Sequence, residues 1–193
     1  ATLADSPLNS LVTLENSGIK TLADLKGKKI GYSVSGFETA LLDAMLKSAN
    51  LSNKDVQLIN VNWSLSPSLI SKQVDAVIGS FRNFELNQLA IEGYQGKAFF
   101  PEQHGVPTYD ELIIVANKDK IHEAKYQNFV SALQQATDYL YAHPEESWQL
   151  FVSYKPTELD NELNRRAWKD TLPYLSKQPG TFNKANYEKM ADF

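Results

Sequence analysis

The chain of 193 residues has no cysteine, three histidines and no long apolar run. The absence of cysteine excludes disulfides, thiolate metal sites and a cysteine nucleophile. The histidines His104, His122 and His143 do not have a zinc-binding spacing such as HExxH, and no Gly-x-Ser-x-Gly nucleophile elbow is present. The apolar runs are far shorter than the ~20 residues that a membrane-spanning helix needs. The sequence therefore predicts no catalytic residues, no metal site and no cofactor.

Composition and charge indicate a globular protein without a nucleic-acid partner. Hydrophobic residues make up 42% of the chain, charged residues make up 22%, and the net charge is −4. Lysine and arginine are scattered among aspartate and glutamate, so no surface is predicted that would follow a phosphate backbone. The chain does not begin with methionine and shows no signal peptide, so we expect processing, cloning or proteolysis to have removed its original N-terminus.

The first half of the chain alternates between strand and helix patterns. We expect strands at 29–33, 56–61, 74–78 and 97–100, and helices at 37–49, from residue 66 and at 83–91. Short connections between such elements predict a parallel sheet covered by helices on both faces. Ahead of this region, Ser6 and Pro7 predict the start of a helix that ends at Gly18, with Leu8 and Leu11 on one face.

The second half of the chain is predicted to be helical apart from one strand. A loop at 101–110 leads into an expected strand at 111–116, and helices follow from residue 120. Phe129, Leu133, Ala136 and Leu140 recur at helical spacing and form an apolar stripe. Further helices are expected at 145–154, 157–174 and 183–192, with Trp148 and Trp168 in a core.

The candidate binding residues follow predicted strands, which is where ligands lie in open α/β sheets. Ser35, Gly36 and Phe37 occupy the turn before the helix at 37–49, where free backbone N–H groups favour an anion or a polar acceptor atom. The alternative interpretation is a plain turn with a serine N-cap. We note that the residues of a phosphate-binding P-loop are absent.

A second candidate segment contains Asn83, Phe84 and Glu85. An aromatic ring can stack on a flat heterocycle, while an amide and a carboxylate pair with its donors and acceptors. A carboxylate that faces an aminopyrimidine can accept hydrogen bonds from the exocyclic amine and from a protonated ring nitrogen together. The alternative interpretation makes Asn83 an N-cap and Phe84 a core residue.

Three further residues complete the candidate set. Tyr109 and Glu111 lie at the entry of the strand expected at 111–116, and they either face a cleft or belong to a solvated rim loop. Trp63 follows the strand expected at 56–61 and is a candidate stacking ring. For Trp63 a half-buried aromatic is the favoured alternative.

Several stretches resemble the NMT1/THI5-like substrate-binding proteins of ABC importers. These stretches are 7–11, 18–31, 74–79 and 105–112. The sequence Asp-Leu-Lys-Gly-Lys-Lys-Ile-Gly within 18–31 is typical of several binding-protein subfamilies. The elements Asn83-x-Glu85 and Tyr109-x-Glu111 resemble more narrowly the branch that binds hydroxymethylpyrimidine or formylaminopyrimidine, both precursors of thiamine.

The resemblance implies a type 2 periplasmic-binding-protein fold, an α/β fold of two lobes with one lobe complete and the other partial. Residues 1–9 would end the first lobe-one segment or form a linker, 10–110 would form lobe two, and 111–193 would supply the crossover strand and the C-terminal helices of lobe one. Roughly the N-terminal third of a typical member would be absent. We therefore expect the apolar stripes of those helices to be covered by the missing segment bound in trans or by a dimer partner.

The function implied by the resemblance is binding of a thiamine-precursor pyrimidine, hinge closure around it and delivery to an ABC permease. Such a protein works outside the cytoplasm, either free in the periplasm or held by a lipid anchor. A sulfonate, taurine or nitrate ligand is an alternative. It is disfavoured because Arg82, directly before Asn83, is the single basic residue in the candidate segments. A pyrimidine-forming enzyme like the fungal members, which use pyridoxal phosphate and a cysteine-rich motif, is disfavoured by the absence of cysteine. The effector domain of a transcription regulator is disfavoured because no helix-turn-helix is visible.

Overall fold

The computed structural model describes residues 1–193, which divide into two compact units. Unit 1 consists of residues 1–7 and 108–192, and unit 2 consists of residues 8–107 together with Phe193. The main chain therefore leaves unit 1 after residue 7 and returns to it after residue 107. None of the helices combines the length and the apolar character that crossing a membrane requires.

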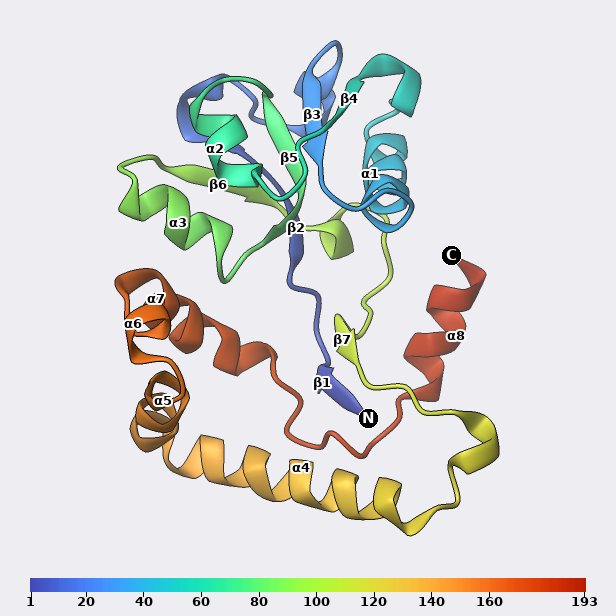
Figure 1. The fold of residues 1–193 in the computed structure, drawn as a ribbon. Helices are drawn as coiled ribbons and strands as arrows, with labels where there is room; N and C mark the ends of the chain where they lie inside the picture. The colour runs from blue at the N-terminus through green and yellow to red at the C-terminus, as the bar shows by residue number, and fades with distance from the viewer. The chain divides into compact units, whose positions relative to one another are not determined.

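Unit 2 is built on a five-stranded sheet with the strand order β4-β3-β5-β2-β6 (Figure 1). The strands are β2 (Asn9–Leu14), β3 (Lys29–Tyr32), β4 (Gln57–Asn60), β5 (Ala76–Phe81) and β6 (Gly96–Phe99). β3 is parallel to β4 and β5, whereas β2 is antiparallel to both β5 and β6. The four strands expected from the sequence, β3 to β6, therefore run in the same direction, as predicted, and the antiparallel strand is β2, which was not expected. We call the edge at which β3, β4, β5 and β6 end, and at which β2 begins, the carboxyl edge.

The helix expected between Ser6 and Gly18 is wrong, because its centre forms β2. All six residues of β2 are buried between its neighbours β5 and β6. Its apolar residues Leu11, Val12 and Leu14 do not alternate strictly with polar ones, and in so short a segment the spacing does not distinguish a strand from a helix. The partners of β2 come from distant parts of the chain, so tertiary pairing decides the outcome.

Helices cover both faces of this sheet. They are α1 (Phe37–Ser48), α2 (Leu65–Ile70) and α3 (Glu85–Ile91), and they confirm the helices expected in this region. Figure 1 shows α2 and α3 on one side of the sheet and α1 on the other. On the α2 and α3 side, Val12 and Val77 pack with Leu65, Leu69 and Leu89 in one buried cluster. Because side chains alternate along a strand, their neighbours Leu11 and Ile78 point to the opposite face, where α1 lies.

Unit 1 combines a small sheet with five helices. β1 (Thr2–Ala4) pairs antiparallel with β7 (Leu112–Ile113), which is shorter than the strand expected at 111–116. On its other side β1 meets a late segment of the chain, since Ser176 N–H donates to Leu3 O at 2.9 Å and Thr2 N–H donates to Pro179 O at 2.9 Å. The helices are α4 (Ala124–Ala142), α5 (Pro144–Ser153), α6 (Pro156–Leu159), α7 (Glu162–Thr171) and α8 (Lys184–Asp192).

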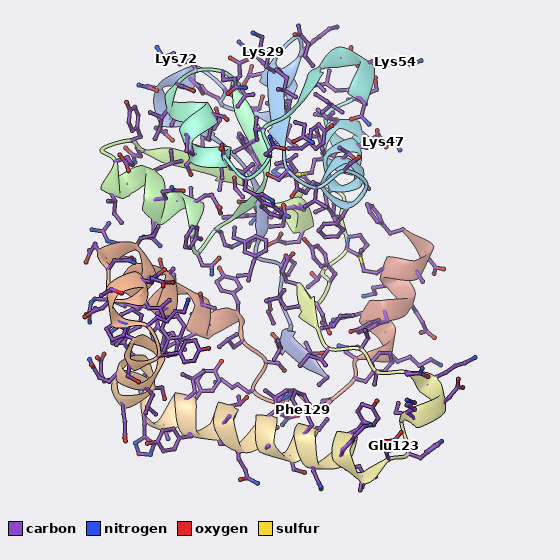
Figure 2. The ribbon with its side chains drawn as sticks, in the orientation of Figure 1. Lys29, Lys47, Lys54, Lys72, Glu123 and Phe129 are labelled. Atoms are coloured by element: carbon purple, nitrogen blue, oxygen red, sulfur yellow. The ribbon has the colours of Figure 1, made fainter.

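The helical region largely matches expectation, with two exceptions. The helix expected at 157–174 is divided into α6 and α7, because Asn161 caps α7 by accepting a hydrogen bond from Asn164 N–H at 2.9 Å. The apolar stripe of α4 is not buried: Phe129 is 48% exposed (Figure 2), and Leu133, Ala136 and Leu140 line an apolar groove of about 210 Å³. Trp148 is buried as expected, with its ring centroid 5.7 Å from that of Trp168.

Candidate functional site

The carboxyl edge of unit 2 brings together two of the segments that the sequence marked. β3 and β5 are paired in parallel, with Gly31 opposite Val77, so the turns that follow them are neighbours. The turn after β3 carries Ser35, Gly36 and Phe37, and the turn after β5 leads into Asn83, Phe84 and Glu85. Six of the nine predicted residues therefore lie in or directly after the two neighbouring turns that follow β3 and β5.

The turn between β3 and α1 is exposed and capped by glycine. Gly36 is the N-cap residue of α1, and the hydroxyl of Thr39 pairs with Gly36 N–H at 3.2 Å. The alternative of a serine N-cap is therefore wrong. Ser35, Gly36 and Phe37 are exposed at the start of this twelve-residue helix. They form one wall of the carboxyl edge.

Glu38 is the functional candidate that the sequence did not reveal. Its side chain is 5% exposed, and its Oε2 accepts hydrogen bonds from Ser33 N–H at 2.8 Å and Val34 N–H at 3.1 Å. No protein group donates a hydrogen bond to Oε1. Burial raises the pKa of the Glu38 carboxyl above its ordinary value, against the opposing effect of the two N–H donors. A glutamate in the first turn of a helix is usually exposed, which is why the sequence pattern gave no sign of it.

A β-bulge at Gly79 makes room for this carboxyl group. In the pairing of β2 with β5, Ser10 lies opposite Ser80 and Leu11 lies opposite Ile78, so Gly79 is the extra residue. Gly79 has a φ of 96°, a conformation that other residues rarely adopt. A Cβ atom at this position would collide with the carboxyl of Glu38. The carboxyl therefore lies directly against the backbone of β5.

Glu85, which the sequence marked, is a second buried carboxylate at the carboxyl edge. Its Oε2 accepts a hydrogen bond from Phe81 N–H at 2.6 Å. Burial raises the pKa of Glu85 to about 7, and the negative charge of Glu38 adds to the increase, while backbone N–H donors oppose it. At neutral pH this group is therefore close to half protonated. A carboxyl in that state can both donate and accept hydrogen bonds.

Asn83 and Phe84 flank Glu85. Asn83 is buried, and its backbone carbonyl oxygen accepts a hydrogen bond from Asn87 Nδ2 at 3.0 Å. The N-cap of α3 is Phe84, so the alternative that makes Asn83 the N-cap is wrong. Phe84 is half-buried, so it is not the fully buried core residue of that alternative. Nearby at the ends of β3 and β5, the buried hydroxyl oxygens of Ser33 and Ser80 have no hydrogen-bond partner in the protein.

Arg82 is fully engaged by the protein itself. Its guanidinium donates to Glu102 Oε1 at 2.7 Å and Oε2 at 3.0 Å, and to Asn9 O at 3.0 Å. It also lies over the ring of Phe100, with 4.0 Å from Cζ to the ring centroid. The four lysines of unit 2 labelled in Figure 2 lie away from the carboxyl edge: Lys29 opens β3, Lys54 and Lys72 precede β4 and β5, and Lys47 is in the last turn of α1. Glu38 and Glu85 are therefore the ionisable groups at the carboxyl edge that have no ion-pair partner.

The other three predicted residues lie outside these two turns. Trp63 follows β4 and is 81% exposed, so the half-buried alternative is wrong. Tyr109 is buried and Glu111 is half-buried, but both belong to unit 1. In unit 2 the candidate site therefore consists of Glu38 and Glu85 together with Phe37, Asn83 and Phe84. Trp63 lies exposed just beyond the end of the neighbouring strand β4.

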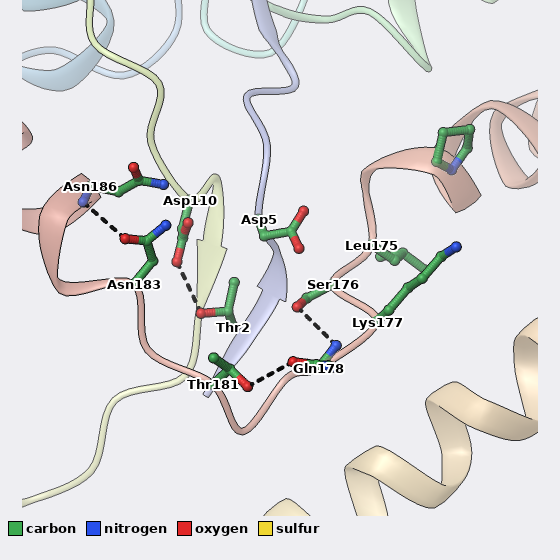
Figure 3. A pocket seen from close by; sticks show the side chains of 11 residues that line it. Thr2, Asp5, Asp110, Leu175, Ser176, Lys177, Gln178, Thr181, Asn183 and Asn186 are labelled. Atoms are coloured by element: carbon green, nitrogen blue, oxygen red, sulfur yellow. Dashed lines mark hydrogen bonds between the residues drawn. The ribbon is translucent and has the colours of Figure 1, made fainter.

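Unit 1 has a polar hollow of about 470 Å³ beside β1 (Figure 3). Several of its polar groups bond to one another: Thr2 Oγ1 donates to Asp110 Oδ2 at 3.0 Å, and Gln178 N–H donates to Ser176 Oγ at 3.3 Å. None of the residues marked by the sequence lines it. No group of three or more histidine, aspartate or glutamate side chains is placed to hold a metal ion.

The fold is that of the periplasmic solute-binding proteins. The structure superimposes on the periplasmic aliphatic sulphonate binding protein SsuA from Escherichia coli with a TM-score of 0.73 at 17% sequence identity. The match covers 99% of this chain and 61% of that protein. At this level of identity the likeness defines the fold of the chain and leaves its ligand open.

The chain belongs to the family described as NMT1/THI5 like, whose sequence pattern matches residues 1–147. It is 64% identical over 191 residues to a Haemophilus influenzae protein named as a thiamine biosynthesis protein, covering 99% of this chain and 61% of that protein. It is 29% identical over 155 residues to the formylaminopyrimidine-binding protein of Halalkalibacterium halodurans, covering 79% of this chain and 47% of that protein. The resemblance inferred from the sequence is confirmed.

The relatives also include enzymes. A Saccharomyces cerevisiae 4-amino-5-hydroxymethyl-2-methylpyrimidine phosphate synthase is 27% identical over 191 residues, covering 91% of this chain and 55% of that protein. The chain thus spans about half to three fifths of the length of these relatives.

Proposed function

We propose that this chain is part of a binding protein for a thiamine-precursor pyrimidine, hydroxymethylpyrimidine or formylaminopyrimidine. The observation that carries the proposal is the buried carboxyl of Glu85 at the carboxyl edge, with a pKa of about 7. An aminopyrimidine presents an exocyclic amine beside a ring nitrogen, and a carboxyl that shares one proton with that nitrogen pairs with both groups. The name of the Halalkalibacterium halodurans relative supports the same ligand class.

The neighbours of Glu85 suit a flat, polar ring. Phe84 and Phe37 are placed at the same edge to stack on or flank it, and Asn83 supplies an amide to its polar rim. Tyr109 and Glu111 of unit 1 are proposed to contact the ligand when the two units close around it by a hinge movement at the two chain crossings. Trp63, exposed beyond β4, is proposed as an additional stacking ring.

An anionic ligand such as a sulfonate, taurine or nitrate fits this edge less well. Arg82 is held by both oxygens of Glu102 and by a backbone carbonyl, so its charge is already compensated. The ionised forms of Glu38 and Glu85 would repel an anion placed beside them, so an anion could bind there only if these groups took up protons. The same two groups favour a ligand rich in hydrogen-bond donors.

We propose a role in delivery rather than catalysis. The fold shared with SsuA, a protein named as periplasmic, supports a location outside the cytoplasm, free or lipid-anchored, and an ABC permease as the partner that receives the ligand. The fungal synthase relatives make a pyrimidine-forming enzyme the alternative. The complete absence of cysteine disfavours chemistry that depends on a cysteine-rich motif.

Isothermal titration calorimetry on the complete gene product tests the proposal. Hydroxymethylpyrimidine and formylaminopyrimidine should each be titrated, with an alkanesulfonate and taurine as the competing ligand class. We expect saturable heat with at least one pyrimidine and none with the sulfonates. Binding of a sulfonate without any pyrimidine binding would overturn the proposed ligand class, and turnover of a bound pyrimidine would overturn the proposal of a pure binding protein.

A further inference from the structure

The carboxyl group of Glu38 has one oxygen that accepts no hydrogen bond from the protein. Oε2 is fixed by the N–H groups of Ser33 and Val34, whereas Oε1 accepts no hydrogen bond. Oε1 is not among the enclosed atoms that lack a partner, so a ligand can reach it. The fold keeps the carboxyl group in place, because the bulge and the missing side chain at Gly79 provide the space that it occupies.

Other polar atoms at the same strand ends also lack partners. The hydroxyl of Ser80, which is fully buried immediately after Gly79, has no hydrogen-bond partner, and neither has the hydroxyl of Ser33 beside Glu38. The charge of Glu38 also acts on Glu85, so the two carboxyls are electrostatic neighbours at the carboxyl edge. Such a set of unused acceptors is what a ligand rich in N–H donors would satisfy.

We propose that Glu38 is a second ligand acceptor that makes the site selective for an amino over an oxo substituent on the pyrimidine ring. The inference rests on the proposed function. An exocyclic amine has two N–H donors, and Glu85 can accept one of them while it pairs with the neighbouring ring nitrogen. The second N–H then requires another acceptor, which Oε1 of Glu38 supplies. An oxo group at the same ring position would place an oxygen against Oε1, and the two acceptors would repel each other.

The substitution Glu38→Gln gives a sharp test because the backbone dictates the orientation of the new amide. Ser33 N–H and Val34 N–H both require an acceptor, so the amide oxygen must take the position of Oε2. The amide nitrogen then takes the position of Oε1 and presents two N–H donors there. The substitution therefore replaces an acceptor with a donor while it preserves the shape of the side chain.

The experiment compares two probes on the complete gene product: 4-amino-5-hydroxymethyl-2-methylpyrimidine and its 4-oxo counterpart. Calorimetry measures both affinities for the wild type, for Glu38→Gln and for Asp43→Asn. Asp43 is the matched control, since it lies on the same helix in an exposed ion pair with Lys47 at 2.6 Å. We expect the wild type to prefer the amine by about 100-fold or more, and Glu38→Gln to reduce that ratio roughly 10- to 100-fold. Asp43→Asn should leave the ratio unchanged.

The outcomes separate this inference from the proposed function. A wild type that binds neither pyrimidine overturns both. A wild type that binds the amino and oxo rings equally overturns the role of Glu38 alone, and this measurement does not depend on the folding of any variant. A Glu38→Gln protein that has an unchanged circular dichroism spectrum and keeps the preference for the amine also overturns it. Loss of the preference in Glu38→Gln but not in Asp43→Asn supports it.

Discussion

The carboxyl group of Glu38 lies in the space that a side chain on Gly79 would occupy. The first residue belongs to the start of α1 and the second to a bulge in β5, so the contact joins this helix to this strand at the carboxyl edge. Two requirements meet at Gly79: a backbone φ of 96° and an absent Cβ. This arrangement makes the position of a buried carboxylate depend on one glycine in a neighbouring strand.

Replacing Gly79 with alanine should destabilise the protein by more than about 2 kcal/mol, because the strained backbone adds about 1–2 kcal/mol and the collision with Glu38 adds to it. Gly18→Ala is the control, since Gly18 has a φ of 83° but open space around its Cα. Urea unfolding followed by circular dichroism measures both variants. Equal losses of stability would show that the contact with Glu38 contributes nothing.

The raised pKa of Glu85 predicts a stability that falls as pH rises. The pKa is about 7 in the folded protein and 4.5 in the reference state, so the folded form holds the proton more tightly. The free energy of unfolding should therefore decrease by roughly 2–3 kcal/mol between about pH 4.5 and pH 7, and then level off. Glu85→Gln should flatten this profile and be more stable than the wild type at pH 8. The pKa of Glu38 is also raised, so the free energy of unfolding of Glu85→Gln should still decrease with pH, but less steeply than that of the wild type.

The check is a series of urea titrations from pH 4.5 to pH 8.5 on the wild type and Glu85→Gln. Asp43→Asn serves as a control for removing a surface carboxylate, because its partner Lys47 is 70% exposed. If Glu85→Gln and the wild type show parallel profiles, the burial of Glu85 is not what sets the pH dependence.

Ligand affinity should also depend on pH. Above about pH 7 Glu85 is ionised, and a neutral pyrimidine carries no proton on its ring nitrogen, so binding must take up one proton. Affinity should then fall by up to about tenfold per pH unit between pH 7 and pH 9. Calorimetry in buffers of different ionisation enthalpy counts the protons directly. Constant affinity across this range would rule out a shared proton between Glu85 and the ligand.

The carboxyl of Glu85 should matter more for affinity than the ring of Phe84. Removing one partner of a buried charged hydrogen bond costs about 2–5 kcal/mol, whereas aromatic stacking contributes about 0.5–1.5 kcal/mol beyond area burial. Glu85→Ala should therefore weaken pyrimidine binding more than Phe84→Leu. The measurement is the dissociation constant of hydroxymethylpyrimidine for each variant. If Phe84→Leu weakens binding more than Glu85→Ala, the aromatic ring rather than the carboxyl is the main source of affinity.

The ion pair between Arg82 and Glu102 should contribute strongly to the stability of unit 2. The two side chains are 9% and 22% exposed at an N–O distance of 2.7 Å. Glu102→Gln should cost about 2–4 kcal/mol, because it leaves a buried guanidinium with incomplete compensation. Glu162→Gln removes an ion pair of the same 2.7 Å length whose side chains are 44% and 58% exposed, and it should cost less than about 1 kcal/mol. Similar losses in the two variants would contradict the role assigned to burial.

The spacing of apolar residues along the chain was sufficient to predict those helices that form from contiguous sequence. The start of α1 at Phe37 and the amphipathic helix through Phe129 and Leu140 follow from helical spacing, and both are confirmed. Glu85 was found because it follows a strand in a segment of mixed aromatic and polar residues. β2 was misjudged because its six residues are defined by partners far along the chain, and the same buried run suits a helix equally well.

The sequence by itself determined the family, the α/β character and the turns that carry Glu85, Asn83 and Phe84, because each depends on short-range order along the chain. Only the tertiary structure decided that β2 runs antiparallel through the sheet, that Glu102 compensates Arg82, and that Glu38 is buried against Gly79. The reason is physical: strand pairing, burial and electrostatic coupling arise between residues that are distant in the chain. The pKa of Glu85 and the unused acceptor on Glu38 both follow from that assembly.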